Sequence, residues 1–444
     1  MNRAMHCALI GAAALAVGSA CTPAEKNAPP PGTVSAATRP TKDGTPQHLP
    51  VPPVAANVDC RTLPNPVYMP TTTLIDSLMR KVLPTLADPS PTTGVGPTDQ
   101  MTLIQFPTAS CNAYEVIDQN LEISGTGVYF APGSATPLNC DLPAGTGIKA
   151  DLEAMDVGGQ TCLGAPPQAS MVEFPSHVEA LGFVVPRNST QTSITATEAY
   201  FVMKYAGQTG MEIAPWTDPN FIHIRHGGSS TQLTIGSQIG LPGTMWNSTL
   251  QGNLGSPAVQ AAVIADNSNG NHEKSLGILN SSKWEASLND MRVLAFQPFN
   301  NCFGAIFPDS TSVARDKRNL RDGHYPLWTN LRYVLEHQGG QPFSDNGAPS
   351  AARAKKFIDI MTGQAQATNL DVSLAVIQTG NIPTCAMHVA REVDGGDMKP
   401  FDHPAPCDCY FDKNNGVINP ACVACSTTTP CATGVCRSGF CEPR

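Results

Sequence analysis

The chain has 444 residues, which predicts two or three globular units at roughly 150 residues for each. It carries 27 Lys and Arg against 36 Asp and Glu, and a formal net charge of −9 argues against a nucleic-acid partner. Charged residues are only 14% of the chain, and beyond the N-terminus no apolar run is long enough to span a bilayer. A polytopic membrane protein is therefore excluded.

The N-terminus reads as an export signal. Residues 1–21 combine a positive charge at Arg3, a short apolar stretch and the small residues 18–20 before Cys21. We expect cleavage before Cys21 and lipidation of its thiol, as in a bacterial lipoprotein. Ordinary cleavage after residue 20, with Cys21 left as a thiol or disulfide partner, is the alternative. Residues 22–57 are rich in Pro, Ala and Thr, which predicts a disordered linker.

From residue 58 onward, short apolar strands alternate with helical patterns. Residues 65–69 predict a strand, and the apolar spacing in 71–86 predicts a helix that Thr71 and Thr72 can cap. The same order of strand, polar turn and helix recurs at 101–118 and 221–239, and 180–186 reads as a buried strand. This alternation predicts an α/β fold, in which ligands bind beyond the carboxyl ends of the strands.

Polar turns recur along the body of the chain. They are PTTT at 70–73, ASCN at 109–112, AMD at 154–156, RHGGSST at 225–231, GSPAV at 255–259 with LGIL at 276–279, and DGHYPL at 322–327. In this order they resemble the loops of the phosphate-type substrate-binding proteins of ABC transporters. RHGGSST resembles the family's arginine loop, although Gly227 stands where the family has Asp and Ser230 where it has Gly.

This resemblance implies a two-lobed type II periplasmic-binding-protein fold and a cysteine-rich, lipid-anchored member of the family. The first lobe would comprise residues 58–178 and 325–400, the second 179–324, and 401–444 would form a disulfide-rich tail. The implied function is capture of a small oxyanion, phosphate above all, between the lobes of a monomer. By resemblance, the partner would be an ABC permease, and the location would be the periplasm or the cell surface.

Arg225 and Asp156 are the charged candidates for this site. An arginine offers a positive charge and a two-pronged donor to an oxyanion. A carboxylate beside an anion is favourable only when the ligand has a proton to donate, which hydrogen phosphate has and sulfate lacks at neutral pH. An arginine in a salt bridge at a strand end and an aspartate that caps a turn are the structural alternatives.

Hydroxyl side chains and helix-start N–H groups would complete the anion site. Simple N-capping needs the same residue types and is compatible with binding. The candidates are Thr71, Thr72, Ser110, Ser229, Ser230 and Thr231.

Other functions remain as alternatives. An envelope-anchored sensor or scavenger, or a structural or adhesive protein on the same fold, would use altered or lost ligand contacts. His223 and His226 lie near Arg225, but a histidine without a ligand is the simpler interpretation, and no metal or cofactor is expected. The order Gly227, Ser229, Thr231 lacks the final glycine of a hydrolase nucleophile turn, so no enzyme is expected.

The 15 cysteines together with an export signal predict disulfides. Cys140 and Cys162 are the first choice of pair in the body, and a disulfide at Cys111 would fix a candidate ligand loop. The seven cysteines from Cys407 onward predict a stapled tail, with zinc at Cys422 and Cys425 as the alternative. Removal of the signal and lipidation would leave an odd number, so at least one cysteine is free or pairs between chains.

Overall fold

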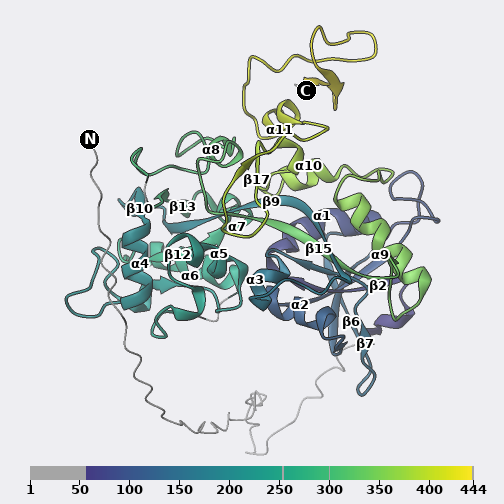
Figure 1. Cartoon of the computed structure of the whole chain (residues 1–444), viewed down its shortest axis with the longest axis horizontal. Coiled ribbons are helices and arrows are strands. Elements are labelled where there is room, and N and C mark those ends of the chain that lie inside the picture. Colours follow the sequence, from purple (N-terminus) through teal and green to yellow (C-terminus); the bar gives the residue numbers. More distant parts are fainter. Residues whose placement is uncertain (1–56, 253–254, 300, 443–444) are drawn as a thin grey trace, which may run out of the picture. The chain divides into compact units, whose positions relative to one another are not determined.

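The computed structural model describes residues 57–252, 255–299 and 301–442 (Figure 1). The predicted export signal, the lipidation site Cys21 and the linker up to residue 56 lie outside the described residues.

A mixed sheet of twelve strands organises the described chain. Its main order is β1-β6-β5-β3-β2-β8-β15-β9-β12-β11, with β13 paired to β9 and β16 to β15. The bounds are β1 Val58–Asp59, β2 Pro66–Thr72, β3 Thr102–Thr108, β5 Thr126–Phe130, β6 Pro137–Asp141, β8 Glu153–Met155, β9 Met171–Pro186, β11 Ile222–His223, β12 Leu276–Asn280, β13 Met291–Val293, β15 Trp328–Gln338 and β16 Gln341–Pro342.

Eleven α-helices and four small strand pairs complete the described fold. The helices are α1 Asp76–Leu86, α2 Ser110–Asp118, α3 Gly159–Leu163, α4 Ala196–Tyr205, α5 Ser230–Gln238, α6 Ser256–Ser268, α7 Ser281–Trp284, α8 Arg318–Arg321, α9 Ala348–Met361, α10 Val372–Ile377 and α11 Asp408–Asn414. The pairs are β4 Glu122–Ile123 with β7 Ile148–Lys149, β10 Ser193–Thr195 with β14 Ala295–Gln297, β17 Val389–Ala390 with β18 Lys399–Pro400, and β19 Val435–Arg437 with β20 Phe440–Glu442.

Two long strands connect the two ends of the sheet. β9 and β15 are antiparallel neighbours, with Met171 opposite Glu336 at one end and Ala180 opposite Trp328 at the other. β15 also pairs with β8, whereas the second half of β9 pairs with β12 and β13. The chain therefore passes from the first half of the sheet to the second in β9 and returns in β15.

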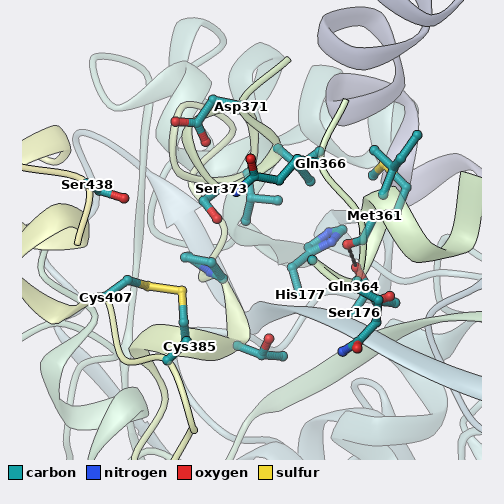
Figure 2. Close-up of a pocket in the computed structure, with 18 of the residues that line it drawn as sticks. Ser176, His177, Met361, Gln364, Gln366, Asp371, Ser373, Cys385, Cys407 and Ser438 are labelled. Atoms are coloured by element: carbon teal, nitrogen blue, oxygen red, sulfur yellow. Dashed lines mark hydrogen bonds between the residues drawn. A yellow bond between two sulfur atoms is a disulfide. The ribbon is translucent and has the colours of Figure 1, made fainter. Parts of the chain in front are cut away.

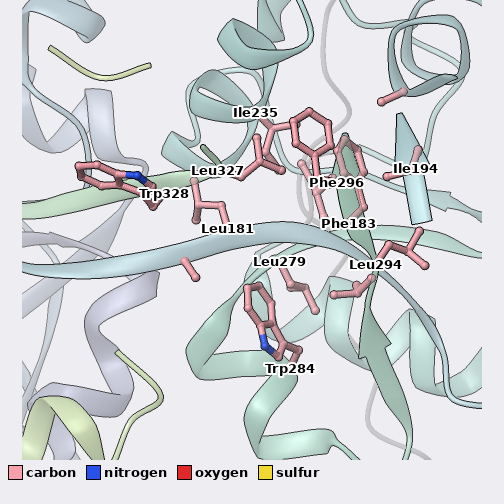
Figure 3. Packing of buried hydrophobic residues seen from close by; sticks show 14 of the residues in the cluster. Leu181, Phe183, Ile194, Ile235, Leu279, Trp284, Leu294, Phe296, Leu327 and Trp328 are labelled. Atoms are coloured by element: carbon pink, nitrogen blue, oxygen red, sulfur yellow. The ribbon is translucent and has the colours of Figure 1, made fainter. Parts of the chain in front are cut away.

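Each half of the sheet has its own apolar core. In the second half, Phe183 of β9 stacks on Phe296 with ring centroids 5.9 Å apart, and both are fully buried (Figure 3). In the first half, Tyr333 of β15 packs edge-on against Phe357 of α9. These separate cores agree with two lobes, whose boundaries in the sequence stay a prediction.

One helix begins later than its apolar spacing predicts. β2 continues to Thr72, a 3₁₀ turn covers Thr73–Ile75, and α1 starts only at Asp76. Thr72 does cap this turn, since its hydroxyl accepts from the Leu74 N–H at 3.4 Å. The expected helix start at Thr71 is wrong because β2 is an interior strand, and its ladder with β3 extends through Thr72.

Six disulfides hold the described chain, and the predicted Cys140–Cys162 bond is not among them. Cys140 pairs with Cys60 because β6, which carries it, lies beside β1, and Cys162 of α3 pairs with Cys111 of α2. The Cys111 bond confirms that a disulfide fixes this candidate ligand loop. The other four pairs are Cys385–Cys407, Cys409–Cys422, Cys425–Cys436 and Cys431–Cys441.

The disulfides agree with the predicted oxidising compartment. They also engage the two cysteines of the tail that were the alternative zinc ligands. Cys422 and Cys425, the alternative zinc ligands, are both disulfide-bonded, and Cys302 is the one free, exposed cysteine among the described residues. So many disulfides are typical of extracytoplasmic proteins. None of the described helices has both the length and the apolarity that a membrane span requires.

The expected boundary at residue 400 is crossed by covalent and polar contacts. The Cys385–Cys407 bond spans it, and Phe411 of α11 is buried in the core of the second half of the sheet. Arg321 of α8 forms ion pairs with Asp408 and Asp412 of α11. The start of the cysteine-rich segment is therefore part of the folded body.

Candidate functional site

The candidate site begins where three parallel strands end. β2 pairs in parallel with both β3 and β8, so the carboxyl ends of the three strands lie at one edge of the sheet. Thr72 ends β2, Ser110 opens α2 two residues after β3, and Asp156 directly follows β8. This topology places three polar side chains from distant parts of the sequence together.

The carboxyl group of Asp156 is the centre of the site. Its Oδ1 accepts a hydrogen bond from Ser110, and its Oδ2 accepts from Ser230 and, at 3.3 Å, from Thr72. Ser230 belongs to the second half of the sheet, so hydroxyls from both halves converge on one carboxyl. Asp156 is fully buried, and the hydroxyls that contact it are at most 3% exposed.

Arg225 supplies the positive charge beside this carboxyl. It follows β11, is 3% exposed and donates through Nη1 to the hydroxyl of Ser256. Burial lowers the pKa of Arg225 to about 10, and the charges of Asp156 and Glu179 act against that shift. The guanidinium therefore remains charged at neutral pH.

Asp156 has competing influences on its protonation. Burial raises the pKa of Asp156, while the hydrogen bonds from Ser110 and Ser230 and the charge of Arg225 oppose the rise. The hydroxyl donors and the guanidinium favour the carboxylate form, but burial is the larger effect, so the pKa stays above that of an exposed aspartate. As a carboxylate, the group is a pure acceptor, which suits a ligand that carries a hydroxyl proton.

Three helices begin at this site, each with a serine in its first position. α2, α5 and α6 start at Ser110, Ser230 and Ser256, and in none of them does the N-cap side chain bond the helix's own first-turn N–H groups. Two of these serines donate to Asp156, and the third accepts from Arg225. First-turn N–H groups and the positive ends of three helix dipoles thus surround the charged pair, an arrangement that favours anions.

The remaining predicted residues are buried nearby without contacting Asp156. The Thr71 hydroxyl donates to the Thr72 carbonyl at 3.3 Å. The hydroxyls of Ser229 and Thr231 are buried and have no hydrogen-bond partner among the described residues. Buried hydroxyls are normally paired, so these two are available as donors to a small polar ligand.

The sequence reasoning missed three contributors. Ser256 was noted only as part of a motif, although a serine between glycine and proline is a usual helix start. Thr329 of β15 donates to the Asp156 carbonyl, and Glu179 lies opposite it in β9. Neither of these strand residues has a distinguishing sequence pattern.

His223 and His226 are not brought to the carboxyl. His223 is buried and forms a 2.7 Å contact through Nε2 with Asp266 of α6. Burial, and then the charge of Arg225, lower the pKa of His226. An unprotonated imidazole adds no positive charge, so His226 does not join Arg225 as a cation of this site.

Glu179 makes the free energy of unfolding depend on pH. Its side chain is fully buried and accepts from Asn280, and burial raises its pKa to about 8, helped by the charge of Asp156. The pKa of an unfolded glutamate is 4.5 and that of Glu179 in the folded state is about 8. Between these two pH values, the folded state holds a proton that the unfolded state lacks. The free energy of unfolding from this group therefore falls as pH rises, by up to about 1.4 kcal/mol per pH unit.

We expect Glu179→Gln to remove this dependence, because glutamine keeps the oxygen that accepts from Asn280. The stability gain over the wild type should grow from pH 5 to pH 8 and then level off. Chemical denaturation at several pH values measures it, with the exposed Glu115→Gln as control. A gain that is constant over this range would contradict a raised pKa for Glu179.

No protein-family model matches the sequence, and no curated protein matches it. Solved structures are similar to it at low identity. One is a candidate phosphate ABC-transporter substrate-binding protein from Clostridium perfringens with bound phosphate, 13% identical over 72% of this chain and 99% of that chain, with a TM-score of 0.45.

Two further similar structures come from different classes of protein. An ABC-type phosphate transport receptor from Vibrio cholerae is 14% identical over 71% of this chain and 99% of its own, with a TM-score of 0.42. The reduced OxyR regulatory domain from Pseudomonas aeruginosa is 9% identical over 66% and 99%, with a TM-score of 0.34. These similarities concern the fold and do not identify a ligand of this chain.

Proposed function

We propose that the protein is an extracytoplasmic binding protein that captures a small, protonated oxyanion such as hydrogen phosphate. The observation that carries this proposal is the Asp156 carboxyl, which accepts from Thr72, Ser110 and Ser230 of both halves of the sheet. A charged, buried arginine and three helix N-termini lie beside it.

The roles of these groups follow from their chemistry. Arg225 and the first-turn N–H groups of α5 would bind the oxyanion's unprotonated oxygens. The hydroxyls that now donate to Asp156 would turn to the ligand, and Asp156 would accept the ligand's proton. Sulfate has no proton at neutral pH, so it would leave this buried acceptor unpaired beside a negative charge.

The expected lobes and location complete the proposal. Residues 58–178 with 325–400 and residues 179–324 would close around the anion by a hinge in the β9 and β15 connections. A lipid at Cys21 would anchor the monomer to the cell envelope, and an ABC permease would receive the anion. A sensor or scavenger in the envelope would use the same capture step without a permease.

The test compares phosphate with sulfate on the oxidised protein. Phosphate at 1,000 times its dissociation constant adds about 4 kcal/mol to the free energy of unfolding, which raises the melting temperature by roughly 5 °C in a protein of this size. We expect this shift with phosphate and none with sulfate at the same concentration. Calorimetric titration gives the affinities. Equal responses to both anions, or none to either, would count against the proposed site.

Asp156→Asn separates proton recognition from general anion binding. The asparagine amide keeps the size of the side chain, carries no negative charge and offers N–H donors. It can therefore donate to an unprotonated oxygen of sulfate. We expect selectivity for phosphate over sulfate to fall from about 10,000-fold to less than about 100-fold. The exposed Asp402→Asn is the matched control and should retain wild-type selectivity. Unchanged selectivity in Asp156→Asn would remove the proton-reading role from this carboxyl.

A further inference from the structure

A cavity lies apart from the Asp156 site. It has a volume of about 660 Å³ and is bounded by β9, the segment that follows α9 and the cysteine-rich segment. None of the residues of the Asp156 site lines it. In Figure 2, His177 and Met361 lie on one side, and Ser438 and the Cys385–Cys407 disulfide on the other. Its volume is within the range of small-molecule sites.

Part of the cavity wall is apolar. Met361, Leu370 and Val376 contribute side chains from the end of α9, the following loop and α10, and Pro383 and Pro404 add to them. Met361 and Val376 are also members of the buried core. The wall is therefore backed by packed structure, and it suits the apolar body of an organic ligand.

His177 is a buried polar group with an unused atom in this wall. Its side chain is 3% exposed, and Nδ1 has no hydrogen-bond partner among the described residues. Backbone hydrogen bonds between Val178 and Ile382 and a 2.9 Å bond from the Ser176 hydroxyl to the Met361 carbonyl fix its position. Burial lowers the pKa of His177 to about 3, so the imidazole is neutral and adds no charge to the wall.

Arg437 brings a positive charge to the cavity from the β19–β20 hairpin. Its Nη2 donates to the Pro404 carbonyl at 3.2 Å, while Nη1 is buried without a hydrogen-bond partner. Within the described ranges, Arg437 forms no ion pair. The neighbouring Cys436 is disulfide-bonded to Cys425, which holds this part of the hairpin. A guanidinium with an unused donor prefers a planar, two-oxygen acceptor, above all a carboxylate.

Asp371 limits the negative charge that the cavity accepts. One of its oxygens caps α10 by accepting from the Leu374 N–H at 2.8 Å, and the other accepts from the Tyr410 hydroxyl at 2.5 Å. Both oxygens are thus engaged within the protein and are not free to bind a cation. Their charge disfavours a second anionic group on the ligand, so a single carboxylate fits better than a dicarboxylate or a phosphate.

We propose that this cavity binds a small organic monocarboxylate with an apolar body. The carboxylate pairs with Arg437, and the apolar body lies against the Met361 side of the wall, beside the neutral His177. The cysteine-rich segment then has a definite role, because it supplies the cation and one wall of the site. This inference does not depend on phosphate capture at Asp156.

The test uses benzoate and octanoate as probes, titrated by calorimetry into the full oxidised protein. The Arg225→Ala variant is titrated in parallel, so that any carboxylate binding at the Asp156 site is recognised by its loss in that variant. We expect dissociation constants at or below about 1 mM. Benzamide, which keeps the ring but lacks the charge, should bind at least about 10-fold more weakly because it cannot form the charged pair with Arg437.

Two variants separate this site from adventitious binding. Arg437→Gln should weaken benzoate at least about 10-fold, whereas Arg318→Gln, an arginine with 72% of its side chain exposed, should not change it. Ala405→Trp places a large ring at an exposed position on the cavity wall and should abolish binding without removing any group that holds the fold.

The proposal is overturned if neither probe binds at about 10 mM. It is also overturned if Arg437→Gln and Ala405→Trp both bind benzoate like the wild type. Far-ultraviolet circular dichroism and melting temperature establish that each variant is folded. A crystal soaked with 4-iodobenzoate supports the proposal if the iodine and carboxylate lie between Arg437 and Met361, and contradicts it if they lie elsewhere.

Discussion

Replacing Arg225 by alanine is expected to weaken phosphate binding by roughly 100- to 1,000-fold. The arginine is 3% exposed, and its charge acts on Asp156. Loss of a buried, hydrogen-bonded charge costs about 3 to 4 kcal/mol, because the ligand and Asp156 would both remain negative in a site without a cation. Calorimetric titration with phosphate measures the change.

Arg225→Lys refines this expectation. Lysine keeps the positive charge but not the planar fork, and Nη1 of the arginine is used to hold Ser256 at the start of α6. We expect a loss of about 10-fold, intermediate between the wild type and alanine. A lysine variant as weak as alanine would show that geometry rather than charge dominates.

A control variant must show that loss of a buried arginine elsewhere in the protein does not weaken phosphate binding. Arg321 is 5% exposed and forms ion pairs with Asp408 and Asp412 of α11. Arg321→Ala should therefore destabilise the protein but leave its phosphate affinity within about twofold of the wild type. Equal losses of phosphate affinity in both alanine variants would point to general unfolding and contradict a specific role for Arg225.

Removal of the Cys60–Cys140 disulfide is expected to cause the largest loss of stability among single disulfide deletions. Its sequence separation of 80 residues is greater than those of the other five disulfides in the described chain, which range from 10 to 51. The cross-link restricts the unfolded chain, and for a loop of this length the effect is about 4 to 5 kcal/mol. In a protein of this size, the melting temperature should fall by roughly 5 °C.

The double variant Cys60→Ala with Cys140→Ala tests this, because it leaves no unpaired thiol. The matched comparison is Cys431→Ala with Cys441→Ala, whose 10-residue separation predicts a loss of only about 3 kcal/mol. Thermal unfolding of both under oxidising conditions gives the ranking. If the Cys431–Cys441 deletion lowers the melting temperature more than the Cys60–Cys140 deletion, loop entropy is not the main contribution of these disulfides to stability.

The sequence predicted most of the candidate site because the site lies in local patterns. Thr72, Ser110 and Ser230 each follow an apolar strand or open a helix, so their positions can be read from short segments. Asp156 likewise stands directly after a buried strand. What these segments could not show was that three of the hydroxyls contact one carboxyl. That depends on the pairing of β2 with β3 and β8, and on the position of α5, which brings Ser230 from the second half.

The disulfides illustrate the limit of such reasoning. Cys140 and Cys162 are close in sequence, and proximity favoured their pairing. The observed partners are set by neighbours in space, because β1 at the edge of the sheet pairs in parallel with β6 and α2 contacts α3. Long-range pairing of this kind follows from the whole topology, so no local pattern around Cys60 or Cys111 specifies the partner.

Residues that act through long-range contacts were likewise missed. Thr329 lies in an interior strand, and Arg437 lies in a short hairpin near the C-terminus. Neither has a motif, and each is hydrogen-bonded to a segment more than 30 residues away, Asp156 for the first and Pro404 for the second. A single sequence cannot identify such residues from composition or spacing.

The position of β15 in the sheet has a consequence for synthesis of the chain. β15 lies between β8 and β9, yet Trp328–Gln338 is made more than 140 residues after β9. Until then, β8 and the first part of β9 lack their common neighbour and have open hydrogen-bonding edges, which promote aggregation. A nascent chain truncated before residue 328 should therefore depend on a chaperone to stay soluble, whereas one that includes β15 can close its sheet.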